Sequence, residues 1–395
     1  MKQNMQDLTE GSLGKKILIF SVPLMLSNLL QVLFNMADIA VIGQFAGSLS
    51  LGAVGSTATL VTMFTGFLIG LSGGINVLTA LYYGAKDKDS LSKTIHSAAL
   101  VSLIMGVLLL VLGVGLSEWM LTALKTKEEL LDKAVLYLRI YYLGMPALAI
   151  YNFGNAVYSA VGNTKKPLYY LGFSGVLNII LNLLFVWVFH WGVAGSATAT
   201  MLARMFSMVT VLVKLRNPQL EIQLRKYFTI RPDWDEIKRI LRIGVPSGVE
   251  NSMFQFGKLA IQSTVSLMGT AAIAAQGMAS IIENLNGIMG IGIGIGLMTV
   301  VGETLGAGRK EEAVYYVKKL CIVSEVVIIA SCLLLYALVR PITYFGGMEP
   351  ESAKMCIFMV TCITIIKPLI WVMAFVPAYG FRAAGDVKFT MTVSM

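Results

Sequence analysis

The chain has 395 residues, of which 56% are hydrophobic and 13% are charged, with a formal net charge of +9. A soluble domain carries about 25% charged residues, so this composition excludes a water-soluble globular protein and indicates a polytopic all-α membrane protein. The basic residues stand mainly in short segments between apolar runs, which favours membrane topology over nucleic-acid binding as their explanation. The spacing of the four cysteines predicts neither a zinc site nor a disulfide framework.

Ten apolar windows are each long enough to cross a bilayer as a helix. We predict spans at 17–42, 52–82, 94–117, 134–160, 168–189, 193–213, 241–266, 273–303, 316–339 and 355–381, and the start of an eleventh at 387–395. The first is interpreted as a retained span, because no signal-peptide cleavage site follows it. Five prolines fall inside spans and are expected to kink them, namely Pro23, Pro146, Pro246, Pro368 and Pro377.

The first span carries a polar stripe. Asn28, Gln31, Asn35 and Asp38 follow one another at i, i+3, i+7 and i+10, so they share one helix face. A polar face at this depth must contact protein or water, and a charge inside a bilayer is costly and usually functional. We therefore predict that Asp38 takes up a proton or a sodium ion. The alternative is a structural acid that is hydrogen-bonded between helices.

The fourth and fifth spans supply side-chain amides. Asn152 and Asn155 are expected to line a substrate cavity, and Asn178 and Asn182 share a face at i, i+4. Carboxamide oxygens suit sodium, and carboxamides also hydrogen-bond a protonated carboxyl. For each amide alone, a role in holding helices together is an equal alternative.

Loop charges predict the orientation. With the N-terminus in the cytoplasm, 22 of the 31 basic residues fall in inner segments and five in outer ones, the distribution that cytoplasmic loops show. The basic linker 214–242 is the predicted boundary between two lobes, which we assign to residues 1–220 and 221–395.

The seventh and eighth spans carry further polar candidates for the substrate cavity. These are Glu250, Asn251, Gln255, Lys258 and Glu283. Glu250 and Lys258 lie about 12 Å apart along a helix axis, too far for direct contact, so each is expected to pair across helices. For Glu250, a structural buried pair is the favoured alternative.

The chain also repeats itself about 222 positions later, the pattern of a two-lobed transporter. Val22-Pro23 matches Val245-Pro246, and Gly84-Ala85 matches Gly306-Ala307. The first copy holds six predicted spans and the second holds four, so we expect a chain shortened at its C-terminus by two helices. A ten-helix protein is the alternative.

Several motifs together resemble the multidrug and toxic compound extrusion (MATE) transporters, and more narrowly their bacterial branch with the DNA-damage-inducible DinF proteins. The motifs are Val22-Pro23, Asp38-x4-Gly43, Gly84-Ala85, residues 160–167, Asn178-Ile-Ile-Leu-Asn182 and residues 192–200. The resemblance implies twelve helices in two six-helix lobes and export of cationic or amphipathic compounds in exchange for H⁺ or Na⁺. It also implies that Asp38, Asn178 and Thr200 line a cavity in the first lobe, and a bacterial inner-membrane location.

Two departures from the family pattern matter. Asn182 stands where many relatives carry an aspartate, which removes one carboxylate from the first lobe. Relatives of the sodium-type branch carry an acidic residue on the seventh helix, and Phe254 occupies that position here, with Glu250 one turn earlier. The resemblance therefore implies no sodium site in the second lobe.

We expect a monomeric antiporter without a cofactor, in which Asp38 carries the transported H⁺ or Na⁺ together with Asn178, Asn182 and Thr200. A lipid-linked precursor flippase of the same superfamily is one rival. Such a flippase is expected to have more basic residues in its cavity, whereas here only Arg204, Lys258 and Lys367 are candidates. A membrane-embedded enzyme is disfavoured, because no nucleophile–base or metal set stands in the spans. A passive channel is a further rival.

Overall fold

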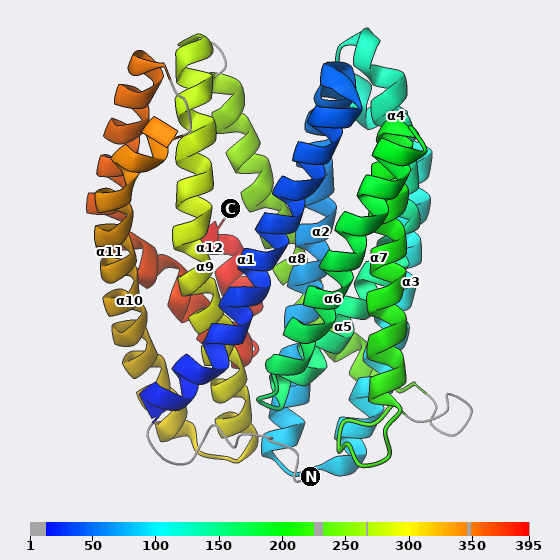
Figure 1. Ribbon diagram of the computed structural model, residues 1–395. Helices are drawn as coiled ribbons and strands as arrows, with labels where there is room; N and C mark the ends of the chain where they lie inside the picture. Colours follow the sequence, from blue (N-terminus) through cyan, green and yellow to red (C-terminus); the bar gives the residue numbers. More distant parts are fainter. Residues whose placement is uncertain (1–12, 225–231, 266–267, 346–348, 395) are drawn as a thin grey trace.

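The computed structural model describes residues 13–224, 232–265, 268–345 and 349–394, and the regular structure in these ranges is helical (Figure 1). The helices are α1 Leu13–Phe45, α2 Gly47–Gly84, α3 Lys88–Ala123, α4 Glu128–Leu143, α5 Met145–Ala160, α6 Lys165–Asn182, the π-helix η1 Leu183–Val188, α7 Gly192–Leu215, α8 Trp234–Val265, α9 Thr270–Gly306, α10 Lys310–Phe345, α11 Pro350–Ala383 and α12 Val387–Ser394.

Among the described residues, each predicted span falls on a helix for nearly all of its length, but the predicted fourth span is two helices. The axes of α4 and α5 differ by 46° at Gly144. Pro146 stands in the first turn of α5, where its missing N–H and its ring end the preceding helix. The expected kink is therefore confirmed there, whereas Pro23, Pro246, Pro368 and Pro377 lie inside continuous helices.

By length and composition, eight described helices can cross a membrane, or nine if the bent α4–α5 pair counts as one span. Helix α8 is not among them, although we predicted a span at 241–266. The helix is present, but its first turns carry Asp235, Glu236, Lys238 and Arg239, and its middle carries the polar residues Glu250, Asn251, Gln255 and Lys258. These side chains lower its mean hydropathy below that of its neighbours.

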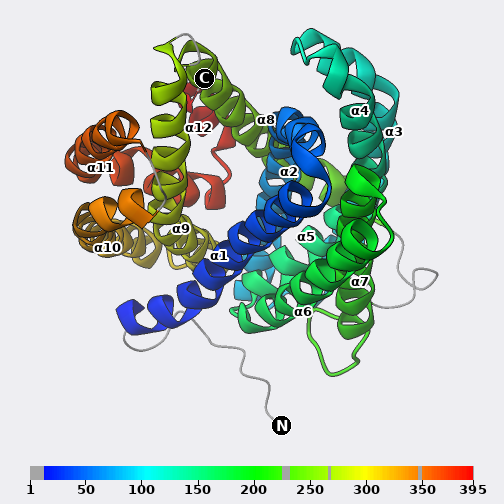
Figure 2. The same cartoon turned by 45° about the horizontal axis from the view of Figure 1, so that its top comes forward.

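The helices gather in two groups with α1, α2 and α8 between them. Figures 1 and 2 show α3–α7 on one side and α9–α11 on the other. Successive long helices reverse direction, so the turns after α2, α5, α7, α9 and α11 share one end of the bundle. This is the end to which the charge pattern assigns the cytoplasm.

Helices α2 and α8 touch backbone to backbone in the halves nearest this end. A Cβ atom added at Gly74 would lie 2.7 Å from the backbone nitrogen of Gly244, closer than real Cβ atoms approach. A buried polar joint lies next to this crossing, because Thr299 on α9 donates to Asn76 Oδ1 at 3.2 Å and Asn76 donates to the Ala156 carbonyl on α5 at 3.2 Å. The two helix groups are thus tightly joined at the predicted cytoplasmic end.

Candidate functional site

The four residues predicted for cation coupling lie together where α1, α6 and α7 meet. Asn182 Nδ2 donates to Asp38 Oδ1 at 2.6 Å, and Thr200 Oγ1 donates to Asp38 Oδ2 at 3.5 Å. Asn178 Nδ2 in turn donates to Thr200 Oγ1 at 3.3 Å. We call Asp38, Asn178, Asn182 and Thr200 the Asp38 cluster.

Local sequence explains why α6 presents its amides to Asp38. Asn178 and Asn182 are one turn apart on the same buried face. One turn earlier, Gly175 lets α6 approach the ring of Phe34 on α1, where any Cβ would collide. The π-helical segment η1 begins directly after Asn182, and such wide turns occur often at functional sites.

The Asp38 cluster is rich in oxygen. The Asn178 and Asn182 side-chain oxygens are buried and have no hydrogen-bond partner among the described residues. With the Asp38 carboxylate and the Thr200 hydroxyl, they form a set of hard oxygen donors suited to a small hard cation. The described residues contain no group of three or more His, Cys, Asp or Glu side chains that could hold a metal ion. A single carboxylate among neutral oxygens fits a monovalent cation or a proton.

Arg204 supplies a positive charge next to the Asp38 cluster. It lies on α7 one turn after Thr200, stacks over the Tyr141 ring at 4.0 Å and donates to the Tyr141 hydroxyl. It is also close enough to Asp38 for an electrostatic interaction. A neighbouring guanidinium favours the charged form of a carboxylate and disfavours binding of a further cation. The Tyr141 contact holds this guanidinium at a fixed place.

The other candidates of the first half lie apart from this cluster. Gln31 and Asn35 are exposed side chains on α1, and Asn152 and Asn155 are half-buried on α5. None of the described hydrogen bonds joins these four amides to Asp38. Their assignment to a substrate cavity stays a prediction.

Glu250 forms a cross-helix ion pair. Its Oε1 lies 2.7 Å from Arg382 Nη2 on α11 and accepts a hydrogen bond from Ser394 Oγ on α12 at 3.0 Å. The Glu250 and Arg382 side chains are only 11% and 13% exposed. The pair therefore holds α8, α11 and α12 together, as the structural alternative for Glu250 anticipated, and its assignment to substrate binding is untested.

The remaining candidates lie on α8 and α9. Asn251 donates to the Ser247 carbonyl at 2.9 Å, within its own helix, and Gln255 is half-buried. Lys258 donates to Asn284 Oδ1 on α9 at 3.4 Å. Glu283, also on α9, lies 3.9 Å from the ammonium of Lys367 on α11. The expected cross-helix partner of Lys258 is thus an amide.

Comparison with known proteins decides the family. The MatE family model matches residues 23–184 and 246–395, which include Asp38, Asn178 and Asn182. The chain belongs to the MATE family of transporters. "Probable multidrug resistance protein YpnP" of Bacillus subtilis is 30% identical over 307 residues, covering 77% of this chain and 68% of the relative. "DNA damage-inducible protein F" of Escherichia coli is 29% identical over 210 residues, covering 52% of this chain and 45% of the relative.

Solved structures support the same fold. A multidrug resistance MATE family transporter in an outward-facing conformation superposes with a TM-score of 0.91 at 20% identity, covering 100% of this chain and 88% of that one. The fold is thus the all-α MATE fold that the family resemblance implied, and the chain is a multi-span transporter for small molecules in a membrane.

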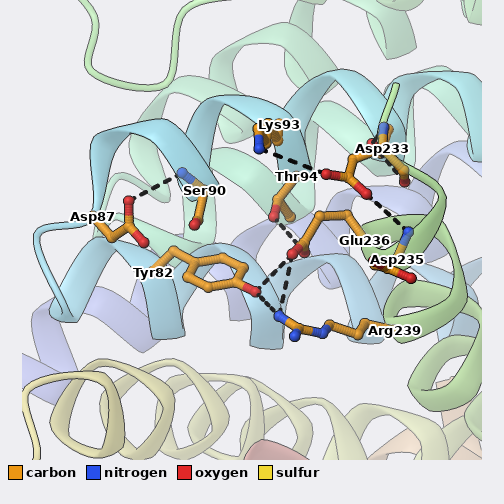
Figure 3. Close-up of polar contacts among 10 residues, drawn as sticks. Tyr82, Asp87, Ser90, Lys93, Thr94, Asp233, Asp235, Glu236 and Arg239 are labelled. Carbon is orange, nitrogen blue, oxygen red and sulfur yellow. Dashed lines mark hydrogen bonds and ion pairs between the residues drawn. The ribbon is translucent and has the colours of Figure 1, made fainter. Parts of the chain in front are cut away.

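This MATE chain also has a polar cluster between α2, α3 and α8 that the sequence did not predict. At the start of α8, the Glu236 carboxylate is 8% exposed and accepts hydrogen bonds from Tyr82 on α2 at 2.8 Å and Thr94 on α3 at 2.9 Å (Figure 3). Arg239, one turn later, pairs with Glu236 at 3.2 Å and donates to the Tyr82 hydroxyl. We call Tyr82, Thr94, Glu236 and Arg239 the Glu236 clasp. In the sequence, the acidic residue Glu236 within the basic linker 214–242 could have indicated this cluster.

A second contact flanks the Glu236 clasp. The Asp233 backbone N–H donates to Ser97 Oγ at 3.0 Å, and the Asp233 carboxylate lies 3.6 Å from Lys93 Nζ (Figure 3). A hydrogen bond from the Asp235 backbone N–H, helped by Lys93, holds the pKa of the Asp233 carboxyl below its ordinary value. The end of the linker is thereby fixed to α3.

Proposed function

We propose that this MATE protein is a cation-coupled antiporter that exports amphipathic and cationic organic compounds across a bacterial inner membrane. The observation that carries the proposal is the Asp38 cluster, a single membrane-embedded carboxylate surrounded by amide and hydroxyl groups. The carboxylate binds H⁺ or Na⁺, and residues 1–220 and 221–395 act as the two lobes that move against each other.

Loading of the cation changes the contacts that join three helices. With the carboxylate free, Asn182 and Thr200 donate to it. A sodium ion needs the amide oxygens in place of the amide N–H groups, and a proton on Asp38 removes one acceptor. Either event rearranges the α1–α6–α7 contacts. A cation can shift the conformational equilibrium only through such a difference in contacts between two states.

The cargo and the orientation rest on separate observations. Relatives carry names such as "Probable multidrug resistance protein", which supports export of varied organic compounds. The excess of Lys and Arg in the turns after α2, α5, α7, α9 and α11 supports a cytoplasmic N-terminus.

Transport by purified protein in proteoliposomes tests the proposal. Vesicles are loaded with ethidium or with a zwitterionic fluoroquinolone, and H⁺ and Na⁺ gradients are imposed separately. We expect at least one gradient to drive uptake or release of a probe against its own gradient. Movement of both probes that only follows their own gradients would overturn the antiporter and favour a channel.

A further inference from the structure

The two halves of the chain differ in the sign of their membrane-embedded charges, at positions that do not coincide in the repeat. In the internal repeat, Asp38 corresponds to Ile261, so the second half lacks that acid. The second half instead carries Lys258 where the first has Asn35, and Lys367 where the first has Met145. Two lysines have therefore replaced neutral residues in the membrane-embedded part of the second half, where a charge is costly.

Lys367 is the more deeply buried of the two lysines. Its side chain is 5% exposed, and its ammonium has no hydrogen-bond partner among the described residues. Glu283 at 3.9 Å supplies opposite charge but stands beyond hydrogen-bond distance. A lysine ammonium has three N–H donors, and a buried donor without an acceptor costs free energy.

Lys258 brings a second positive charge to the same region. Its ammonium donates to Asn284 Oδ1 and is close enough to Lys367 for the two charges to repel each other. Among the described residues, Glu283 is the one acid within ion-pair distance of either lysine. Glu283 pairs with Lys367 alone, and Lys258 has only a neutral amide as its partner, so positive charge exceeds negative charge in this region.

Aromatic rings connect the two lysines. Lys258 Nζ lies 5.1 Å from the centre of the Phe254 ring, and Lys367 Nζ lies 5.3 Å from that of Trp371. Phe375 contacts both rings, with centroid distances of 5.7 Å to Phe254 and 5.1 Å to Trp371. A continuous aromatic surface therefore ends in an ammonium group on either side.

We propose that Lys258 and Lys367 bind an oxyanion, a phosphate, sulfonate or carboxylate, whose apolar body lies on Phe254, Phe375 and Trp371. Resting on the proposed transport function, this adds amphiphiles that carry an acidic group, zwitterions among them, to the amphipathic and cationic cargo. Without cargo, the Glu283 carboxylate pairs with the Lys367 ammonium. When cargo binds, its oxyanion accepts hydrogen bonds from Lys367 at shorter distance and replaces Glu283 as the partner. Charge-assisted hydrogen bonds are the strong ones in such a site.

Equilibrium binding to the full chain in phosphatidylcholine nanodiscs tests this. The probes are naphthyl phosphate and naphthyl trimethylammonium, which share one aromatic body and differ in charge. We expect naphthyl phosphate to bind about tenfold tighter or more, since a hydrogen bond to a charged group contributes on that scale. Lys258→Met and Lys367→Met should each remove most of this preference, and Glu283→Gln should increase it.

Two variants serve as controls. Lys354→Met removes an exposed lysine from the same helix α11 and should leave both affinities unchanged. Lys367→Met combined with Glu283→Gln removes both members of the ion pair, so its loss of preference cannot come from a Glu283 left alone. Equal affinities for the two probes, or a preference that survives this double variant, would overturn the proposal.

The source of the oxyanion is separable from the site. Adding phosphatidylglycerol to the nanodiscs should weaken naphthyl phosphate binding if the site accepts a lipid headgroup, and should leave it unchanged if the cargo is soluble. Both results support the oxyanion site. Failure of cation coupling would show in the proteoliposome gradients and failure of this site in the nanodisc affinities, so the two failures have different signatures.

Discussion

Asn182 at the end of α6 donates a 2.6 Å hydrogen bond to Asp38 in the C-terminal half of α1, across 144 residues of sequence. Thr200 and Asn178 extend this contact into α7 and back to α6. The bond makes the packing of three helices depend on the chemical state of one carboxylate.

Removal of this donor should therefore damage coupling. We expect Asn182→Ala to lower gradient-driven efflux about tenfold, because a hydrogen bond to a charged group contributes roughly 1.5–3 kcal/mol. The matched control is Gln219→Ala, which removes an exposed side-chain amide just after α7, and it should retain most of the wild-type efflux. Equal losses in the two variants would argue against a specific role for Asn182.

The Glu236 clasp should stabilise the end of the bundle where the two helix groups meet. We expect Glu236→Ala to cost about 2–3 kcal/mol, since it leaves the buried Tyr82 and Thr94 hydroxyls without their acceptor. Thermal unfolding in detergent measures this as a lowered Tm. Glu221→Ala is the control, because its pair with Lys88 is exposed and such pairs contribute about 0–1 kcal/mol.

The α2–α8 crossing should tolerate no side chain at Gly74. We expect Gly74→Ala to destabilise the protein by about 1–3 kcal/mol, the usual cost of overpacking, because the added Cβ meets the Gly244 backbone. Gly115→Ala on α3, where nothing lies within 4 Å of the added Cβ, should be neutral or slightly stabilising. Similar shifts in Tm for both variants would contradict the close crossing.

The Glu250–Arg382 pair should act as a unit in stability. Glu250→Gln or Arg382→Met alone should cost about 3–5 kcal/mol, because each leaves a buried charge without its partner. The double variant should cost less than the sum of the two. A double-mutant cycle on Tm checks this, and simple additivity would show that the two charges do not interact.

Much of the fold follows from local patterns. Apolar length predicts the helices, and the Pro146 signal predicts the break between α4 and α5. The polar stripe identifies Asp38 from one helix alone. In contrast, the membrane crossing of α8 does not follow from its mean hydropathy. A helix at the centre of a bundle is covered by other helices, so it can carry polar residues in its middle and charges in its first turns.

Contacts between distant segments could not be predicted in this way. Glu250 pairs with Arg382, 132 residues later in the chain, and Glu236 accepts a hydrogen bond from Tyr82, 154 residues earlier. Periodicity within a helix predicts which face of that helix a residue lies on. The packing of the helices decides which neighbouring helix that face contacts. The Asp38 cluster was predicted as a set only because its motifs resemble those of a family.

Substrate-driven cation movement in proteoliposomes tests the central claim most directly. A gradient of a transported compound is imposed, and the movement of H⁺ and of Na⁺ is recorded for wild type and Asp38→Asn. We predict that the wild type moves one of these cations against the compound and that Asp38→Asn, folded with an unchanged Tm, moves neither. Wild-type cation movement by Asp38→Asn would contradict the assignment of coupling to this carboxylate.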